Sequence, residues 1–481
     1  MRNKPIVVII IASLFLGAST LTRGHDWGDD FASYIMQAGS ILSGRTREFV
    51  EHNSFTIFES SSQIGPVAYP WGYPLILSPI YAIKGMNPLA LKLPGLCFYA
   101  GFLVCLYFLI KSRLTRSESL LIVSLFAFNP LLIQFLDQIL SDIPFLFLST
   151  LSLLMMTNEK KRVARDYILL GCVTAGAFFI RATGILLLVS FFLLESLTAW
   201  NNRTDRKTIK RKVWNIVTVG STFGLLWIVY TLLFPGGAES YVAKYQAFQI
   251  QTALSFIYRY FQVFSLFFGE SVIWQTLYCI LFIFFLGGAW KRRREDTLFL
   301  IFVSLWMIVV ITWPSWQGPR FIFPLLPVFI YFTFQGMKAF VGRLPEKYSQ
   351  PGKWMFCGFW LLIIGMFIFN SSAGAYVNLQ NSRTINGPFD PCSEEVYKYI
   401  KKETPSDSVV IFFKPRVMRL ITDHDTIMST ECDRMFKGDY LVLSRNVGAN
   451  QQIPPEEIEA CNLRLNEVLK NTRFIIYEIQ Q

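Results

Sequence analysis

Two adjacent carboxylates, Asp29 and Asp30, stand a few residues after an apolar run near the start of the chain. Two like charges side by side repel each other, and capping a helix that begins here would need only one of them. A carboxylate can also take the proton of a reacting hydroxyl group, as a general base does. We therefore interpret Asp29 as a candidate base and Asp30 as a second catalytic candidate.

Further ionisable residues stand at the ends of apolar segments. Asp142 lies in LSDIPFLFL, Arg181 in FIRATG, Arg320 in WQGPRFIFP, and Lys414 and Arg416 in FFKPR. Ionisable groups beside a membrane are costly and are functional candidates for that reason. Guanidinium and ammonium groups can hold a phosphate that leaves with growing negative charge. Transfer of a sugar from a polyprenyl phosphate to a hydroxyl group would use both kinds of residue.

The composition predicts a polytopic membrane protein. Of the 481 residues 53% are hydrophobic and only 16% are charged, whereas soluble domains carry about a quarter charged residues. Several apolar runs reach the roughly 17–25 residues that cross a bilayer. The net charge of +12 is explained by basic residues in cytoplasmic loops, so we expect no nucleic-acid partner.

The hydropathy pattern predicts about eleven transmembrane helices. These are residues 5–21, 94–110, 118–136, 143–157, 167–180, 183–199, 213–234, 273–290, 297–313, 321–338 and 354–370. We interpret the first as an uncleaved helix rather than a signal peptide, because many spans follow it. Basic residues concentrate in alternate loops, as in KTIKRK (207–212) and KRRR (291–294). This alternation predicts a cytoplasmic N-terminus and a C-terminus outside.

The predicted organisation has two parts. Residues 1–370 form a transmembrane catalytic domain whose first external loop, 22–93, contains interfacial helices, one of them the Pro-rich stretch 70–85. A second external loop, 235–272, is expected to contain another interfacial helix. Residues 371–481 alternate apolar and charged stretches and predict a small extracytoplasmic α/β domain. Its expected strands are 409–413, 440–444 and 473–479, and its expected helices are 393–403 and 454–471.

The cysteine and histidine residues give weaker signals. Cys392, Cys432 and Cys461 lie in the polar C-terminal part, where two of them could form a disulfide outside the cytoplasm. The sequence does not decide which two. His25 and His52, with nearby Asp26 and Glu48, match no metal-ligand spacing. We therefore expect no cofactor, with a divalent metal as the less favoured alternative, and interpret Asp137 as a solvated turn residue.

Four motifs in one order resemble the GT-C glycosyltransferases, which include the dolichyl-phosphate-mannose protein mannosyltransferases and the bacterial lipid A aminoarabinose transferases. WGDDFASYIMQAGSIL is similar to their first-loop acidic motif and YPWGYPLILSPIYAI to their Pro-rich interfacial segment. LSDIPFLFLSTLSLL is similar to the acidic start of their fourth helix and RFIFPLLPVFIYF to the start of a late helix. FFKPR looks like an element of bacterial relatives with an external α/β domain.

The resemblance covers roughly residues 1–340 and implies that Asp29 is the base. Asp30 stands where the family often has Glu, so its acceptor contact departs from the pattern. Tyr69 stands where the aminoarabinose transferases have a lysine before proline. Tyr69 thus becomes a substrate-binding candidate, and the phosphate role moves to the basic candidates. Those are Arg181, Arg320, Lys414 and Arg416.

These observations predict an inverting glycosyltransferase in the bacterial inner membrane. Its partners would be a polyprenyl-phosphate-linked sugar, membrane lipids, and an acceptor that is a protein, a lipid or a glycan. A transporter or flippase of a lipid-linked or anionic substrate is the alternative from another class. A transferase of whole glycans, or a glycan polymerase, is the alternative within the class.

Overall fold

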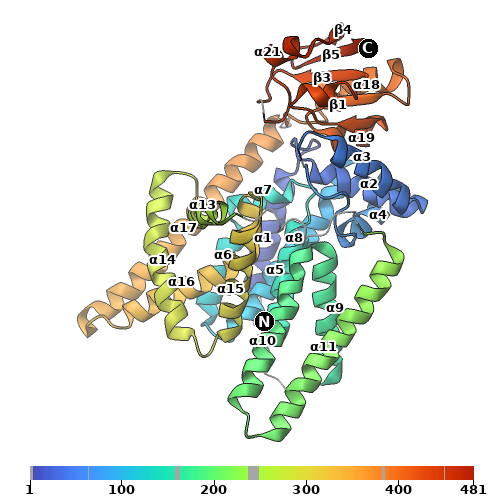
Figure 1. Ribbon diagram of the computed structural model, residues 1–481. Coiled ribbons are helices and arrows are strands. Elements are labelled where there is room, and N and C mark those ends of the chain that lie inside the picture. The colour runs from blue at the N-terminus through green and yellow to red at the C-terminus, as the bar shows by residue number, and fades with distance from the viewer. Residues whose placement is uncertain are drawn as a thin grey trace.

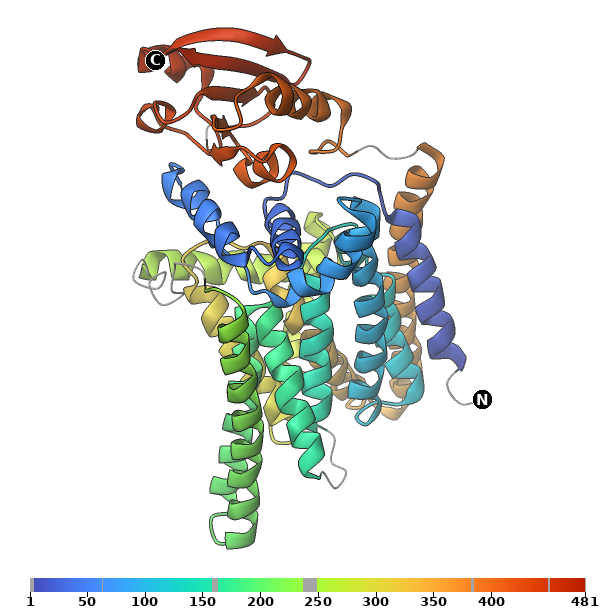
Figure 2. The same cartoon turned by 90° about the vertical axis from the view of Figure 1, so that its right-hand side faces the viewer.

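The computed structural model describes residues 4–62, 64–157, 163–236, 249–381, 385–448 and 450–480. A bundle of apolar helices carries a C-terminal domain with a β-sheet at one end (Figure 1). Three helices of the first loop lie between the bundle and this domain in both ribbon views (Figures 1 and 2). They are α2 (Asp30–Ser43), α3 (Thr46–Glu59) and α4 (Gly72–Lys84).

The described bundle contains long helices joined by short turns. They are α1 (Lys4–Thr20), α5 (Pro88–Lys111), α6 (Arg116–Ala127), α7 (Pro130–Leu136), α8 (Asp142–Thr157), α9 (Ala164–Ile180), α10 (Ile185–Asn201), α11 (Arg206–Leu233), α13 (Ile250–Val263), α14 (Val272–Arg292), α15 (Thr297–Thr312), α16 (Leu326–Val341) and α17 (Glu346–Asn381), with the 3-10 helices η1 (Ala182–Gly184), η2 (Phe264–Phe267) and η3 (Pro319–Leu325). Each of the eleven predicted spans coincides with one of these helices or, for 118–136, with the α6–α7 pair.

Six helices in the described ranges are long and apolar enough to cross a membrane. The number rises to seven if α6 and α7, which meet at a bend of 52°, are one span. Three further apolar helices, α1, α8 and α15, are shorter. The membrane character is confirmed, and the number of eleven spans stays a prediction.

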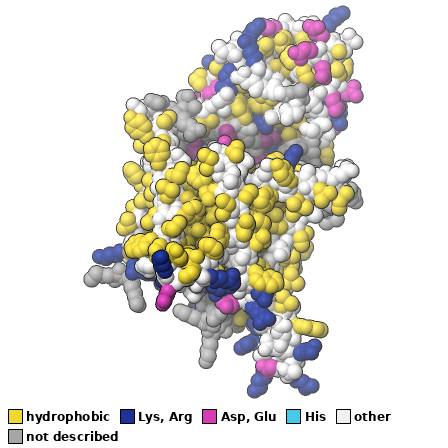
Figure 3. All heavy atoms as spheres, turned by 90° about the vertical axis from the view of Figure 1, so that its left-hand side faces the viewer, with side chains coloured by type: hydrophobic (Ala, Val, Ile, Leu, Met, Phe, Trp, Pro, Cys, Tyr) yellow, Lys and Arg dark blue, Asp and Glu magenta, His cyan; other side chains and the backbone are white. Residues whose placement is uncertain are grey.

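The surface also has the pattern of a membrane protein. A broad hydrophobic band covers the bundle in Figure 3, and Lys and Arg side chains gather at the end of the bundle away from the C-terminal domain. Large apolar side chains are exposed on the bundle helices, for example Phe15 on α1 and Leu232 on α11. In water such a surface would drive association, whereas in a bilayer it contacts lipid tails.

Glycines allow the tightest helix contact. α14 and α16 pack so closely that a Cβ at Gly288 would lie 1.9 Å from the carbonyl oxygen of Phe332. A Cβ at Gly336 would lie 1.8 Å from the carbonyl oxygen of Phe284. Because only glycine lets two backbones approach in this way, these two positions determine the spacing of the α14–α16 pair.

Buried ion pairs hold the two ends of the bundle. Lys92 Nζ of α5 lies 2.6 Å from Asp137 Oδ1 and also donates to the carbonyl oxygen of Gly24 at 2.7 Å. The interpretation of Asp137 as a solvated turn residue is therefore wrong, since it is buried and paired. At the other end Asp296 accepts from Arg113 Nε at 2.5 Å and from Tyr331 Oη at 2.6 Å.

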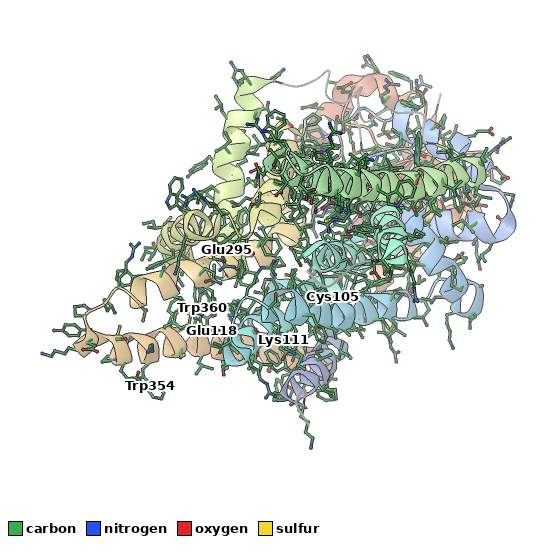
Figure 4. All side chains as sticks on the ribbon, turned by 90° about the horizontal axis from the view of Figure 1, so that it is seen from below. Cys105, Lys111, Glu118, Glu295, Trp354 and Trp360 are labelled. Atoms are coloured by element: carbon green, nitrogen blue, oxygen red, sulfur yellow. A yellow bond between two sulfur atoms is a disulfide. The ribbon has the colours of Figure 1, made fainter. Side chains whose placement is uncertain are left out.

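Figure 4 looks onto that other end of the bundle. Glu118 and Lys111 lie there on neighbouring parts of the chain, and Glu295 lies on the turn after α14. Trp354 projects from the outer side of α17, whereas Trp360 on the same helix is fully buried and stacks on Phe334. Charged side chains thus lie at this end of the bundle and aromatic side chains lie along its helices, as is common in membrane proteins.

The C-terminal domain is a five-stranded mixed sheet with helices. Its elements are α18 (Pro391–Glu403), β1 (Val409–Phe412), α19 (Pro415–Thr422), β2 (Asp425–Ile427), α20 (Cys432–Met435), β3 (Tyr440–Ser444), α21 (Pro455–Ile458), η4 (Glu459–Cys461), β4 (Arg464–Lys470) and β5 (Phe474–Gln480). The strand order is β2-β1-β3-β5-β4. β1 runs parallel to β2 and β3, and β5 runs antiparallel to β3 and β4.

Two boundaries in this part differ from the prediction. The helix predicted over 454–471 is wrong, because only its first residues are helical and β4 follows. Asn462 adopts a left-handed conformation with φ 52°, which ends the helix, and the next residues pair with β5. The predicted domain boundary at 370/371 lies inside α17, since that helix continues to Asn381.

The C-terminal domain is attached to the first loop by polar contacts. Arg434 Nη1 lies 3.0 Å from Glu59 Oε2 at the end of α3, and Lys437 pairs with the same carboxylate. The backbone N–H of Ser61 donates to the carbonyl oxygen of Met428 at 2.9 Å. Asn378 of α17 donates to the carbonyl oxygens of Ser19 and Leu21, both at 2.9 Å. These contacts hold the domain over the segment that contains Asp29 and Asp30.

The structure resolves the cysteine pairing that the sequence left open. Cys432 and Cys461 form a disulfide, and Cys392 is free.

The bond closes a loop with a sequence separation of 29, so the Cys432→Ala/Cys461→Ala variant should lose roughly 3–4 kcal/mol of domain stability. Thermal unfolding of the full chain measures the change. Cys392→Ala is the matched control, and equal unfolding of both variants would contradict a stabilising bond.

Candidate active site

A cavity of about 610 Å³ lies between the first loop and the ends of the bundle helices, a size typical of small-molecule sites. Four segments far apart in the sequence contribute its walls: the first loop with α2, the α7–α8 turn, the α9–α10 turn, and the stretch around η3. Four of the eight predicted site residues line it, namely Asp30, Tyr69, Arg181 and Arg320. The structure therefore brings these four residues together around one cavity, as the sequence predicted.

Asp30 and Arg320 form the central ion pair of this cavity. Arg320 Nη1 lies 2.5 Å from Asp30 Oδ2, and Tyr69 Oη donates to Asp30 Oδ1 at 2.5 Å. Burial alone would raise the pKa of Asp30, but Arg320 and Tyr69 outweigh it and lower that pKa to about 2. Asp30 is therefore ionised at any physiological pH and holds both partners in position.

A second carboxylate–arginine pair lies on the opposite wall. Arg181, directly after α9, pairs with Asp142, the first residue of α8. Arg181 lines the cavity and its guanidinium lies 5.0 Å from the centre of the Phe321 ring. Asp142 is buried behind it and does not line the cavity. Asp142, which the sequence grouped with the catalytic candidates, therefore contacts Arg181 and not the cavity.

Asp29 has a different environment from its neighbour. It directly precedes α2, but its side chain makes no capping hydrogen bond, which argues against the simple capping role. Both of its carboxylate oxygens are buried, and neither has a hydrogen-bond partner in the part of the chain that the structure describes. Burial raises the pKa of Asp29 to about 6, although Arg416 and Lys414 act in the opposite direction. Asp29 lies outside the cavity lining.

Arg416 connects the C-terminal domain with the first loop. It lies on α19, is fully buried, and donates to the carbonyl oxygen of Pro66 and, at 3.5 Å, to Tyr69 Oη. Its guanidinium also lies 5.4 Å from the centre of the Tyr69 ring. Gly65, with φ 140°, passes close to the guanidinium, and a Cβ there would lie 3.0 Å from it. Arg416 therefore supports the cavity wall from behind instead of facing the cavity.

Lys414 lies away from the cavity and is related to the site only through its charge. It precedes α19 and acts on Asp29 through its charge. Neither Lys414 nor Arg416 lines the cavity. The two residues define a basic side of Asp29, and the two arginines of the cavity define a basic side of Asp30.

The sequence reasoning missed Tyr34 and Gln37. Tyr34 lines the cavity, and its hydroxyl forms a hydrogen bond of 2.9 Å with Ser141. Gln37 holds the backbone of Tyr69, donating to its carbonyl oxygen at 2.9 Å and accepting from its N–H at 3.2 Å. Positions 30, 34 and 37 share one face of a helix, so this spacing after the acidic pair was the available signal.

The residues considered for a metal lie in different places. His25 is buried and accepts a hydrogen bond of 3.0 Å from the N–H of Ile139, and its ring stacks on Phe31. His52 lies on α3 and faces Asp425 of the C-terminal domain at 3.5 Å. Within the described ranges, no group of three or more His, Cys, Asp or Glu residues is arranged to hold a metal ion.

Part of the chain resembles a known family. Residues 68–234 match the family model described as dolichyl-phosphate-mannose-protein mannosyltransferase. No curated protein matches the sequence. The matched range includes Tyr69, Asp142 and Arg181 and ends before Arg320.

Two groups of solved structures share the fold. ArnT from Cupriavidus metallidurans bound to undecaprenyl phosphate has a TM-score of 0.62 at 11% identity, covering 99% of this chain and 98% of that one. Archaeal oligosaccharyltransferase AglB from Archaeoglobus fulgidus, in complex with an inhibitory peptide and a dolichol phosphate, has a TM-score of 0.56 at 10% identity, covering 91% and 69%. The family match and the shared fold confirm the predicted resemblance to the GT-C glycosyltransferases and, with it, the predicted enzyme class.

Proposed function

We propose that this chain transfers a sugar from a polyprenyl-phosphate donor to an acceptor hydroxyl group with inversion at the sugar carbon. The observation that carries the proposal is the cavity in which Arg181 is held by the buried Asp142 and Arg320 by the partly buried Asp30. Trp313 and Trp316 add an apolar wall to the same cavity. Arginines beside an apolar wall suit a ligand with a phosphate at one end and an isoprenoid chain at the other.

In the proposed mechanism the two arginines bind the donor phosphate and stabilise its charge as the bond to the sugar breaks. Asp29 accepts the proton of the acceptor hydroxyl, because its carboxylate has no hydrogen-bond partner within the described ranges and its pKa lies near neutrality. Its oxygens are covered in this structure, so the acceptor has to enter between the first loop and Arg416. Asp30 stays ionised and positions Arg320 and Tyr69.

We further propose that the cavity and the C-terminal domain face the extracytoplasmic side. The basic side chains at the opposite end of the bundle support this orientation, since cytoplasmic loops collect Lys and Arg. The Cys432–Cys461 disulfide of the C-terminal domain supports it as well, because such bonds persist in oxidising compartments. The bacterial inner membrane, the sugar and the acceptor class stay predictions.

The transporter alternative has less support. A substrate path would place charged groups near the middle of the helices, whereas the paired acids and arginines lie at their ends beside the C-terminal domain. The family match over 68–234 also favours transfer chemistry.

Asp29→Asn should lower kcat for sugar transfer by about 100-fold or more, because the loss of a general base typically costs 10²–10⁴-fold. The variant should fold and retain the donor, since the Asp29 side chain makes no hydrogen bond in the described structure. Purified protein, a lipid-phosphate sugar and a product assay measure the effect. Asp26→Asn, an exposed carboxylate of the same loop, is the matched control. Near wild-type turnover of Asp29→Asn would exclude it as the base.

The pH profile gives an independent check on Asp29. A base is active only when deprotonated, and the pKa of Asp29 is about 6. The value of kcat/KM should therefore be constant above that pH and fall about tenfold for each unit below it. If kcat/KM is still unchanged one pH unit below the pKa of Asp29, Asp29 is not the base. Asp30, whose pKa is about 2, would then be the candidate base.

The phosphate role of Arg181 can be tested without leaving a buried charge unpaired. The Asp142→Asn/Arg181→Gln variant removes both members of the pair, and the KM for the donor should rise roughly 10–100-fold, the equivalent of one charged hydrogen bond. The matched control is Glu118→Gln/Lys338→Gln, which neutralises a pair at the other end of the bundle. If both variants change the donor KM equally, Arg181 does not bind the phosphate.

A further inference from the structure

A second cavity, of about 440 Å³, shares no lining residue with the candidate active site. It lies between the C-terminal domain and the turn that joins α4 to α5. Met86 of that turn and Phe389, which precedes α18, contribute apolar walls. The proposed transfer reaction uses none of the residues of this cavity.

Three lysines of α18 line the same cavity. Lys398, Lys401 and Lys402 follow each other at spacings of three and one, so they lie on one side of the helix. All three are exposed, and within the described ranges none forms an ion pair. Glu394, one turn earlier, also lines the cavity. The lysines outnumber this carboxylate, so the cavity has a net positive charge.

Tyr397 provides the second, independent sign of a ligand. Its side chain lines the cavity and only 3% of the residue is exposed. Its hydroxyl is buried and has no hydrogen-bond partner in the part of the chain that the structure describes. Burying a hydroxyl without a partner is unfavourable. Because this hydroxyl is covered in the structure, a ligand oxygen would satisfy it once the side chains over it move apart.

The neighbourhood of the cavity indicates that the ligand is a lipid. On either side of Met86, Ile83 at the end of α4 is 77% exposed and Leu89 at the start of α5 is 36% exposed. α5 is one of the helices long and apolar enough to span a membrane. The cavity therefore lies where a span begins, at the level where lipid headgroups meet water.

We propose that this cavity binds the phosphate headgroup of an anionic membrane lipid. Lys398, Lys401 and Lys402 pair with the phosphate, the Tyr397 hydroxyl donates to one of its oxygens, and the acyl chains lie along Ile83 and Leu89. Lysines at a membrane surface attract anionic lipids in this way. The site is separate from the donor site, and the proposal does not depend on the transfer reaction.

The cavity is nevertheless in contact with the catalytic loop. The ring of Phe389 lies 6.2 Å from the ring of Phe31, which directly follows Asp30. Phe31 in turn stacks on His25, with ring centres 4.0 Å apart. A headgroup bound against Phe389 would therefore hold the C-terminal domain and the acidic loop against the same bilayer surface.

The test is a binding titration of the full chain in detergent with phosphatidylglycerol or phosphatidylcholine, read by native mass spectrometry. Phosphatidylglycerol should bind in preference, and Lys398→Gln/Lys401→Gln/Lys402→Gln should weaken its binding by about 100-fold, since each lysine near the surface contributes about a factor of five. The control Arg445→Gln/Arg464→Gln/Lys470→Gln removes three exposed basic side chains elsewhere on the same domain and should leave binding unchanged. Equal weakening by both triple variants would overturn the proposal.

Two further arms identify the ligand chemistry. Tyr397→Phe removes only the buried hydroxyl, so it should weaken phosphatidylglycerol binding several-fold while thermal stability is maintained. Unchanged binding of this variant would exclude the hydroxyl as a ligand and overturn that part of the assignment. Glycerol phosphate, which has the headgroup charge without acyl chains, should not compete. Competition as effective as that of the lipid would show a site for soluble anions and overturn the lipid assignment.

Discussion

The ion pair between Asp30 and Arg320 is the interaction on which the site depends. The two residues are 290 positions apart in the sequence, and both side chains are partly buried. A buried charge without a partner is strongly unfavourable, so the first loop and the start of η3 must come together. The Asp142–Arg181 pair applies the same constraint to α8 and α9. The cavity is the space that these two pairs enclose, and its two guanidinium groups are fixed by carboxylates before any ligand arrives.

Adjacent acids in one motif acquire opposite properties for a geometric reason. Asp29 precedes α2 and Asp30 begins it, so their side chains leave the backbone in different directions. Asp30 faces the cavity and is neutralised by Arg320. The Asp29 carboxylate is buried near the basic residues of the C-terminal domain and accepts no hydrogen bond within the described ranges. Pairing lowers one pKa and burial raises the other. Two identical residues thus provide a fixed anion and a group that can exchange a proton near neutral pH.

The C-terminal domain contributes to the site although none of its residues lines the main cavity. Arg416 supports Tyr69 and Pro66 from behind, and the contacts of Glu59 with Arg434 and Lys437 hold the domain in place. The wall of the cavity is therefore shared between two parts of the chain. The cavity beside α18 lies on the same domain, so a lipid bound there would act on the position of Arg416 through the packing of α18 against α19.

Local pattern was enough to identify the membrane helices, the strands β1, β3 and β5, and the residue types of the site. Hydropathy, strand propensity and charge at helix ends are properties of short stretches, so the sequence by itself determined them. The structure alone revealed that Asp137 is buried against Lys92, that β4 forms where a helix was expected, and that Cys432 pairs with Cys461. It also separated the roles of Asp29 and Asp30 and placed Arg416 behind Tyr69. Each of these depends on contacts between residues distant in sequence or on the direction of one side chain, and neither is encoded in a local pattern.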